Sequence, residues 1–349
     1  MKIAQIAPLI ESVPPTMYGG TERVVSWLTE ELVRRGHQVT LFASGDSRTA
    51  AELVAVTPRA LRLDPHVRES LPYNIMMMDQ VAARAGEFDV LHFHIDFFHY
   101  PLFRRTPHRV LTTLHGRLDL PDLQPFYRAF SEMPVVSISN HQRLPMPSVN
   151  WMGTVYHGLP DILRLGAGKG GYLAFLGRIA PEKGPEQAIA IAKRAGIPLK
   201  MAAKVDPVDR EYFEVRVRPL LDHPLIEFIG EIGDARKQDF LGNAMALLFP
   251  IDWPEPFGLV MIEAMAVGTP VIAFSCGSVS EIIEPGLTGC IVKTVEEAVA
   301  ALPEVVRLSR AAIRQSFERR FTVEIMAAQY LAIYDRLVNG HAGLTQAAA

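Results

Sequence analysis

The stretch from Pro254 to Met265 predicts a helix whose first turn could bind an anion. The apolar run begins after Gly258, and the helix should end before Gly268. The first amides of a helix have no acceptor within it, and with the helix dipole they attract a phosphate or a sugar hydroxyl. A glycine at the tip lets the backbone approach such a group closely. The amides concerned belong to Gly258, Leu259 and Val260.

Two glutamates, Glu255 and Glu263, lie on either side of this tip, eight positions apart. Glu255 precedes the helix, where its carboxylate could accept hydrogen bonds from the ring hydroxyls of a sugar. Glu263 lies one turn after Leu259 on a helix that is apolar on nearly all sides, so an ionised carboxylate there needs partners. A ribose diol would supply two donors. In the structural alternative, Glu255 caps the helix dipole and Glu263 pairs with a nearby lysine or arginine.

Two cations follow the first predicted strand of the second half of the chain. Arg178 ends the segment Leu176-Gly177-Arg178, and Lys183 lies in Glu182-Lys183-Gly184. A planar guanidinium and a compact ammonium at a strand end suit two phosphates, and they would stabilise a departing nucleotide without a metal ion. The alternative is a solvated charged surface in front of a helix.

The E-P-F-G-L setting of the two glutamates resembles the donor-site motif of glycosyltransferase family 4, a large group of retaining enzymes with the GT-B fold. The resemblance extends over nearly the whole chain. Arg178 and Lys183 resemble the diphosphate-binding arginine and lysine of the family, and the segment from Tyr18 to Glu22 resembles its glycine loop, which faces the donor phosphates and the acceptor. His115 resembles the histidine that faces the transferred sugar, although a lone histidine at a strand end is otherwise more often structural.

The resemblance implies a hexosyltransferase that takes its sugar from a nucleotide diphosphate sugar, retains the anomeric configuration and needs neither metal nor cofactor. The acceptor hydroxyl would attack from the face on which the diphosphate leaves, and a phosphate oxygen could take its proton. UDP-glucose is favoured as the donor on family frequency, with GDP-mannose next. The acceptor, whether a small molecule, a glycan or a lipid-linked group, is left open.

The residues that the resemblance assigns fall into three groups. The catalytic group comprises His115, Arg178, Lys183 and Glu255. The donor-binding group comprises Gly19, Gly20, Gly177, Phe257, Gly258, Leu259, Val260 and Glu263. Contacts to the acceptor or the sugar are expected from Tyr18, His94, Ser139 and Asn140.

A competing metal site is suggested by His92, His94 and Asp96, which alternate along a predicted strand end and so share one face, as zinc or iron ligands would. His99 follows shortly after them. No second cluster of His, Cys and Asp with ligand spacing occurs elsewhere in the sequence, and family members often carry His-x-His here in the wall of the cleft. We therefore predict that no metal is bound.

Short β-branched runs alternate with helical patterns along the chain, which is typical of βαβ units and a parallel sheet. The strands predicted in the first half are Lys2–Pro8, Gln38–Ala43, Asp89–Phe93, Val110–Leu114, Val135–Ser139 and Gly153–Tyr156. The helices there include Thr21–Arg35, with Thr21 as N-cap and Gly36 after its end, and Tyr73–Ala85. The strands predicted in the second half are Tyr172–Leu176, Leu199–Ala203, Ile226–Ile229, Ala246–Phe249 and Val271–Phe274.

A chain of 349 residues exceeds one ordinary hydrophobic core, so two domains are expected. We predict an α/β fold of the GT-B type, in which two facing Rossmann-like, doubly wound parallel-sheet domains enclose a cleft. The predicted parts are an acceptor-side N-terminal domain (1–160), a glycine-rich linker (161–171), a nucleotide-sugar-binding C-terminal domain (172–322), a helix crossing back to pack on both domains (323–340), and a tail (341–349).

The composition excludes several classes of function. A net charge of −3 provides no basic field for a nucleic-acid backbone. Cys276 and Cys290 form no CxxC pair, which favours a reducing compartment, and the apolar run after Lys2 is too short for a signal sequence or a membrane span. We therefore predict a cytoplasmic protein. Arg104 and Arg105, beside apolar residues, permit contact with a membrane surface, but a solvated loop is favoured.

Two other functions stay open. A sugar-nucleotide epimerase or a glycan phosphorylase can also use two facing domains, although the sequence singles out no lysine for a Schiff base. A protein that binds a nucleotide sugar without transferring it is the second, and the intact set of Glu255, Glu263, Arg178 and Lys183 argues against it. Motifs of serine hydrolases, zinc proteases and P-loop nucleotidases do not occur in the sequence.

Overall fold

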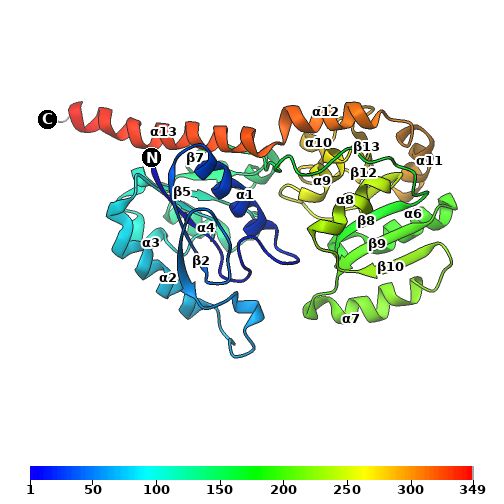
Figure 1. Ribbon diagram of the computed structural model, residues 1–349, viewed down its shortest axis with the longest axis horizontal. Helices are drawn as coiled ribbons and strands as arrows, with labels where there is room; N and C mark the ends of the chain where they lie inside the picture. Colours follow the sequence, from blue (N-terminus) through cyan, green and yellow to red (C-terminus); the bar gives the residue numbers. More distant parts are fainter. Residues whose placement is uncertain (348–349) are drawn as a thin grey trace. The chain divides into compact units, whose positions relative to one another are not determined.

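The computed structural model describes residues 1–347, with side chains as far as residue 339. The chain forms two compact units: the first comprises Met1–Gly158 and the residues from Val323 onward, and the second comprises Leu159–Thr322. Each unit is built on a parallel sheet of its own with helices packed on it (Figure 1). The two doubly wound α/β units predicted from the alternation of strands and helices are therefore confirmed.

The sheet of the first unit has seven parallel strands in the order β3-β2-β1-β4-β5-β6-β7. The strands are β1 (Lys2–Ile6), β2 (Gln38–Ser44), β3 (Glu52–Thr57), β4 (Val90–Phe93), β5 (Val110–Thr113), β6 (Val135–Ser137) and β7 (Trp151–Thr154). The helices of this unit are α1 (Gly20–Arg34), α2 (Leu71–Arg84), α3 (Tyr100–Phe103), α4 (Leu123–Ala129), α5 (Asn140–Arg143) and α13 (Val323–Ala347).

The sheet of the second unit has six parallel strands in the order β10-β9-β8-β11-β12-β13. The strands are β8 (Leu173–Arg178), β9 (Leu199–Lys204), β10 (Ile226–Gly230), β11 (Ala246–Phe249), β12 (Val271–Phe274) and β13 (Gly289–Val292). The helices are α6 (Pro185–Ala195), α7 (Arg210–Tyr212), α8 (Asp234–Asn243), α9 (Leu259–Ala266), α10 (Val279–Ile282), α11 (Val295–Val305) and α12 (Arg310–Arg320), and a short 3₁₀ helix, η4 (Pro181–Lys183), follows β8.

Both sheets reverse their strand order at one position, between β1 and β4 in the first unit and between β8 and β11 in the second. In an open parallel sheet, the crevice beyond the carboxyl ends of the strands at such a reversal is where ligands bind. His94 directly follows β4, Arg178 ends β8, and the loop with Glu255 follows β11. The topology therefore places the predicted functional residues of each unit at the ligand-binding end of its sheet.

Several local predictions differ from the structure. The strands β3 and β13 were not predicted, although each has a short apolar run, Leu53–Val56 in β3 and Cys290–Val292 in β13; each lies at an edge of its sheet. Helix α1 begins at Gly20 rather than after Thr21, with Gly19 as an N-cap that offers no side chain, so the prediction of a Thr21 cap is wrong. Gly36 follows the end of this helix in the left-handed region, at φ 85°, as expected.

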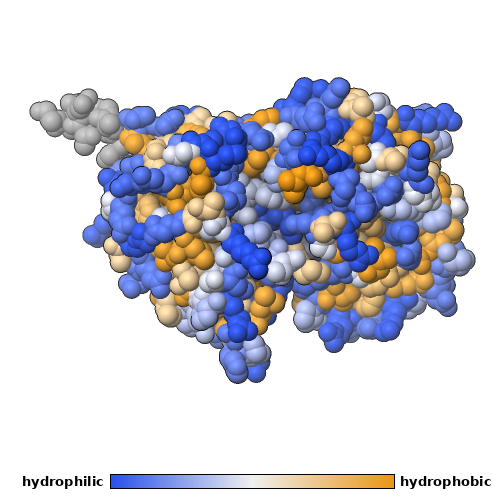
Figure 2. Space-filling model, in the orientation of Figure 1, coloured by the Kyte–Doolittle hydropathy of each residue, from blue (hydrophilic) through white to orange (hydrophobic). Residues whose placement is uncertain are grey.

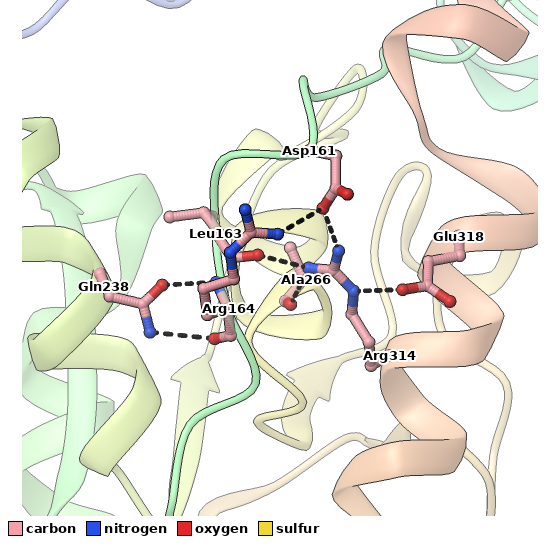
Figure 3. A network of polar contacts seen from close by, with 7 residues as sticks. All are labelled: Asp161, Leu163, Arg164, Gln238, Ala266, Arg314 and Glu318. Atoms are coloured by element: carbon pink, nitrogen blue, oxygen red, sulfur yellow. Dashed lines mark hydrogen bonds and ion pairs between the residues drawn. The ribbon is translucent and has the colours of Figure 1, made fainter.

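The glycine-rich segment predicted as a linker, residues 161–171, belongs to the second unit. The guanidinium of Arg314 in α12 donates to the carbonyl oxygens of Leu163, at 2.8 Å, and Ala266, at 2.5 Å, and forms ion pairs with Asp161 and Glu318 (Figure 3). The backbone of Arg164 is held by the side chain of Gln238. Because these contacts fix the segment to α8, α9 and α12, the boundary lies at Gly158–Leu159 instead.

Helix α13 packs within the first unit. Tyr330 and Tyr334 are fully buried, and the hydroxyl of Tyr334 accepts a hydrogen bond from the Gln5 side chain in β1, at 3.2 Å. Arg336 donates to the carbonyl oxygen of Met152 in β7, at 2.7 Å. The predicted packing of this helix on the second domain stays a prediction. The predicted tail, 341–349, is helical as far as Ala347, and its last two residues lie outside the described part of the chain.

Among the described residues, no helix is both long enough and apolar enough to span a membrane. The face of the protein shown in Figure 2 carries hydrophilic and hydrophobic residues side by side on both units. The apolar residues that gather in the interior of each unit form separate cores, one around the sheet of β1 to β7 and one around the sheet of β8 to β13.

Candidate active site

Lys183 and Glu255 meet at the reversal point of the second sheet. The Nζ atom of Lys183 lies 2.5 Å from Oε2 of Glu255, and both side chains are largely buried. The chain brings them together because η4 packs on the loop after β11: a Cβ atom at Gly184 would lie 2.1 Å from the carbonyl oxygen of Pro250, so only glycine fits there. An ammonium and a carboxylate at this distance form a strong charge-assisted hydrogen bond.

The helix that follows Glu255 has the tip that the sequence predicts. Gly258 is the N-cap of α9 in the left-handed region, at φ 80°, and no side chain caps the first amides. The Cγ atom of Glu255 lies next to this glycine, 3.5 Å from the position of a Cβ there. The ring of Phe257, a residue predicted to bind the donor, is buried against Phe321. The tip and the Lys183–Glu255 pair therefore adjoin each other.

Arg178 is surrounded by carboxylates. Its guanidinium lies 2.5 Å from Glu182, 2.6 Å from Asp209 and 3.9 Å from Asp206. Asp206 is in turn paired with Lys204, at 2.5 Å. Burial raises the pKa of Asp209 above its ordinary value although Arg178 opposes the shift. A diphosphate that binds Arg178 must therefore compete with carboxylates that already hold the guanidinium.

Glu263 forms the ion pair that the sequence left open as the structural alternative. Its Oε1 atom lies 2.6 Å from Nζ of Lys237 in α8, with side-chain exposures of 8% and 14%. Lys237 also contacts Asp234, at 3.1 Å. The carboxylate of Glu263 retains a second oxygen that could accept a hydrogen bond from a ribose. The pair explains how an ionised glutamate is tolerated on a helix that is otherwise buried.

In the first unit, four histidines lie close together near the ends of β4 and β5: His92, His94, His115 and His157. The Nδ1 atom of His94 lies 2.9 Å from Nε2 of His115, and Nε2 of His94 lies 2.8 Å from Oε1 of Gln5. Because a carbonyl oxygen only accepts, His94 donates from Nε2 and accepts from His115 at Nδ1. His115 then carries its proton on Nε2, and its Nδ1 can accept. Stacked on the His115 ring is His157, with ring centroids 5.4 Å apart.

The other residues assigned to the first unit have different surroundings. Ser139 is fully buried, and its Oγ atom accepts from the backbone amide of Gln142, so this side chain caps α5 and is not open to an acceptor. Asn140 is exposed and donates to the hydroxyl of Tyr156, at 3.2 Å. Tyr18 is exposed beside Gly19 and Gly20 at the start of α1. Tyr18 and Asn140 are therefore accessible, as contacts to an acceptor require.

The histidines that suggested a metal site have protein partners. His92 is hydrogen-bonded through Nδ1 to Tyr334 and through Nε2 to Thr113, each at 2.7 Å. Both ring nitrogens of His94 are engaged as well, and the backbone of Asp96 turns into the left-handed region, at φ 55°. Within residues 1–347, no group of three or more His, Cys, Asp or Glu side chains is placed to hold a metal ion.

Protonation of this histidine cluster should lower stability at acid pH. Burial lowers the pKa of His92 and of His94 well below 6.5, and that of His115 to about 3. Below about pH 6.5 these histidines are protonated in the unfolded chain but stay neutral in the folded chain. The free energy of unfolding that is present above this pH is therefore lost as the pH falls toward 3. We expect the free energy of unfolding to drop by roughly 2 kcal/mol per histidine between pH 7 and pH 5.

Urea unfolding at the two pH values checks this expectation. The variant His115→Asn should lose less stability between pH 7 and pH 5 than the wild type, because it has one fewer buried histidine whose protonation favours the unfolded chain. His66→Asn, at an exposed position, is the matched control and should behave as the wild type does. An equal loss in wild type and His115→Asn would contradict the assignment of a buried, neutral His115.

Sequence reasoning missed three residues that shape the site: Trp253, Lys237 and Asp209. Trp253 lies two positions before Glu255 and donates from Nε1 to the same carboxylate oxygen as Lys183, at 2.8 Å. Its position two residues before Glu255 could have marked it as a candidate contact of that carboxylate. Lys237 and Asp209 lie far from their partners along the chain, in polar segments where no local pattern marks them.

Two family models match the chain, and proteins of known function are similar to it. The family model of glycosyl transferases group 1 matches residues 165–318, and the model of glycosyltransferase family 4 matches residues 18–141. The phosphatidyl-myo-inositol mannosyltransferase of Mycobacterium leprae is 25% identical, over 96% of each chain.

Two solved structures share the fold. Sucrose-phosphate synthase from Thermosynechococcus elongatus has a TM-score of 0.77 and 20% identity, covering 97% of this chain and 99% of that one. HepE from Anabaena, in complex with UDP and glucose, has a TM-score of 0.72 and 17% identity, covering 95% and 98%. The two family matches fall on the two units, one each, and the relative spans nearly the whole chain. The chain is therefore an enzyme of the family 4 type of glycosyltransferases, with the GT-B fold.

Proposed function

We propose that this enzyme transfers a hexose from a nucleotide diphosphate sugar to a hydroxyl acceptor, with retention of configuration and without a metal ion. The observation that carries the proposal is the meeting of Lys183 and Glu255 beside the uncapped tip of α9. A cation, a carboxylate and free amides are the groups that a sugar joined to a diphosphate requires. The two free cysteines fit a reducing compartment, and we place the reaction in the cytoplasm.

In this proposal, catalysis comes from charge stabilisation and positioning. Lys183 and Arg178 would neutralise the diphosphate as it leaves, Glu255 would orient the sugar, and Glu263 would accept from the ribose. The acceptor hydroxyl would attack from the face on which the diphosphate departs and give its proton to a phosphate oxygen. We also propose that His115 contacts a sugar hydroxyl, as predicted from the sequence. Its Nδ1 atom would accept the hydrogen bond from that hydroxyl.

The relatives support a nucleotide sugar as the donor. The structure of HepE from Anabaena contains UDP and glucose, and the Mycobacterium leprae relative is named a mannosyltransferase. We therefore keep UDP-glucose as the first candidate donor and GDP-mannose as the second. The acceptor is not specified by any group in the site.

A thermal-shift screen of nucleotide sugars tests the proposed function. A donor at a hundred times its Kd stabilises the folded chain by about 2.7 kcal/mol, which is a measurable shift in Tm. Transfer from the best donor, followed by NMR of the product, then shows whether the anomeric configuration is retained. Donor that is converted to another sugar without any acceptor would instead support an epimerase, and binding without nucleotide release under any acceptor would support a protein that only binds.

Treatment with a chelator should leave turnover unchanged. The leaving diphosphate has two protein cations in the proposed mechanism, so a divalent ion is not required. Turnover is measured before and after dialysis against EDTA, with and without added Mg²⁺ or Mn²⁺. A loss that a divalent ion restores would contradict the metal-independent route.

A further inference from the structure

The indole of Trp253 contacts both members of the Lys183–Glu255 pair. Its Nε1 atom donates to Oε2 of Glu255, at 2.8 Å, and this oxygen also accepts from Lys183, at 2.5 Å. The Nζ atom of Lys183 lies 4.9 Å from the centre of the indole ring, close enough for a cation–π interaction. The edge of the indole therefore contacts the carboxylate of Glu255, and the face of the indole contacts the ammonium of Lys183.

The backbone around Trp253 keeps this geometry firm. The amide of Glu255 donates to the carbonyl oxygen of Trp253, at 2.7 Å, and the carbonyl oxygen of Glu255 accepts from the amide of Ser278, at 3.0 Å. The amide of Asp252 donates to the carbonyl oxygen of Glu182, at 2.8 Å, which ties the loop to η4 and so to Lys183. The indole is thus positioned by the loop that carries Glu255 and by that loop's hydrogen bond to the η4 segment, which carries Lys183.

The pair must change partners if a diphosphate is bound. A phosphate oxygen that takes the ammonium of Lys183 removes from Glu255 the cation with which it is paired. A carboxylate that loses a charged partner while largely buried becomes costly unless another donor remains. The N–H of Trp253 is such a donor, and it leaves Oε1 of Glu255 free to accept from a sugar hydroxyl.

We propose that Trp253 is a positioning residue that keeps Glu255 oriented while Lys183 is exchanged between this glutamate and the donor diphosphate. The inference rests on the proposed function and adds to it a residue outside the motif. The ring face holds Lys183 near the pair in the empty site, and the ring edge holds Glu255 in the occupied one.

The variant Trp253→Phe separates the two contacts, because it keeps a ring for Lys183 and removes the N–H for Glu255. We expect kcat to fall about tenfold, as is typical for the loss of a hydrogen bond to a charged group, while KM for the donor changes by less than about threefold. The probe is UDP-glucose, or the donor found by the screen.

Trp151→Phe is the matched control. Trp151 likewise donates from Nε1, to the carbonyl oxygen of Met146 at 2.8 Å, and carries a cation over its ring, the guanidinium of Arg143 at 5.2 Å. The same chemical change there, in β7 of the first unit, should leave kcat and KM as they are in the wild type. A fall in kcat with Trp151→Phe equal to that with Trp253→Phe would show a general effect on the fold and overturn the proposal.

Fluorescence of the wild type supplies a second signature. Titration of the wild type with UDP, excited at 295 nm, should change the emission as Lys183 leaves the indole of Trp253. The change should be absent in Lys183→Met, which has no ammonium to withdraw, and in Trp253→Phe. An equal change in the wild type and in Lys183→Met would overturn the exchange.

Glu255→Gln distinguishes a failure of this inference from a failure of the proposed function. If Glu255→Gln lowers kcat while Trp253→Phe leaves it unchanged, Glu255 acts without help from the indole, and the positioning role is wrong. If Glu255→Gln also leaves kcat unchanged, the proposed site of transfer is itself wrong.

Discussion

Turnover should fall by a factor of about a hundred or more when Lys183 or Arg178 is replaced by alanine. In the proposed reaction these side chains meet the charge that develops on the leaving diphosphate, and that charge would be left uncompensated. The fall should appear mainly in kcat, because the interaction strengthens as the bond to the sugar breaks. Steady-state kinetics with the best donor of the thermal-shift screen measure both parameters.

The chain offers a close control for each cation. Lys200 forms an ion pair with Glu227, at 3.1 Å, and lies 4.9 Å from the ring centre of Tyr172, so it has the same kinds of partner as Lys183. Arg84, held by Glu52 and Glu87 in the first unit, corresponds to Arg178. Lys200→Ala and Arg84→Ala should keep wild-type turnover. Normal turnover in Lys183→Ala and Arg178→Ala would reject the catalytic assignments.

The second large effect concerns stability. Replacing Lys237 by methionine should lower the free energy of unfolding by about 3 kcal/mol or more, because it leaves the carboxylate of Glu263 buried without its cation. The two side chains are 14% and 8% exposed, so water can do little to replace the lost partner. Urea unfolding at pH 7 measures the change.

A double variant shows whether the effect comes from the stranded charge. Lys237→Met combined with Glu263→Leu removes both charges and should recover most of the lost stability. Lys200→Met breaks an exposed pair and should change the stability by less than about 1 kcal/mol. If Lys237→Met costs no more than Lys200→Met, the pair with Glu263 does not stabilise the fold in the way the structure indicates.

The residues that follow the central strands were the part of the site that could be predicted best from the sequence. The buried central strands are continuous apolar runs, and the residues that follow them are placed at one end of the sheet by topology alone. This is why Arg178, Glu255 and His94 could be assigned to the ligand-binding ends of their units. Edge strands β3 and β13 were missed although their apolar runs, Leu53–Val56 and Cys290–Val292, are visible in the sequence.

The partners of the site residues could not be predicted in the same way. Lys183 and Glu255 are 72 positions apart, and nothing local indicates that they touch. Two of the three carboxylates around Arg178, those of Asp206 and Asp209, come from a segment beyond β9 that has no motif of its own. Burial was equally hidden for Ser139 and Phe257, because the orientation of a side chain at a strand or helix end depends on what packs against it.

The most direct test is calorimetric titration of a nucleoside diphosphate into the wild type and into the double variant Arg178→Ala/Lys183→Ala, with Lys200→Ala as the control. We expect the wild type and Lys200→Ala to bind the nucleoside diphosphate far more tightly than the nucleoside, and the double variant to lose this difference. If the double variant keeps the wild-type preference for the diphosphate, Arg178 and Lys183 do not bind the diphosphate, and the proposed donor site is wrong.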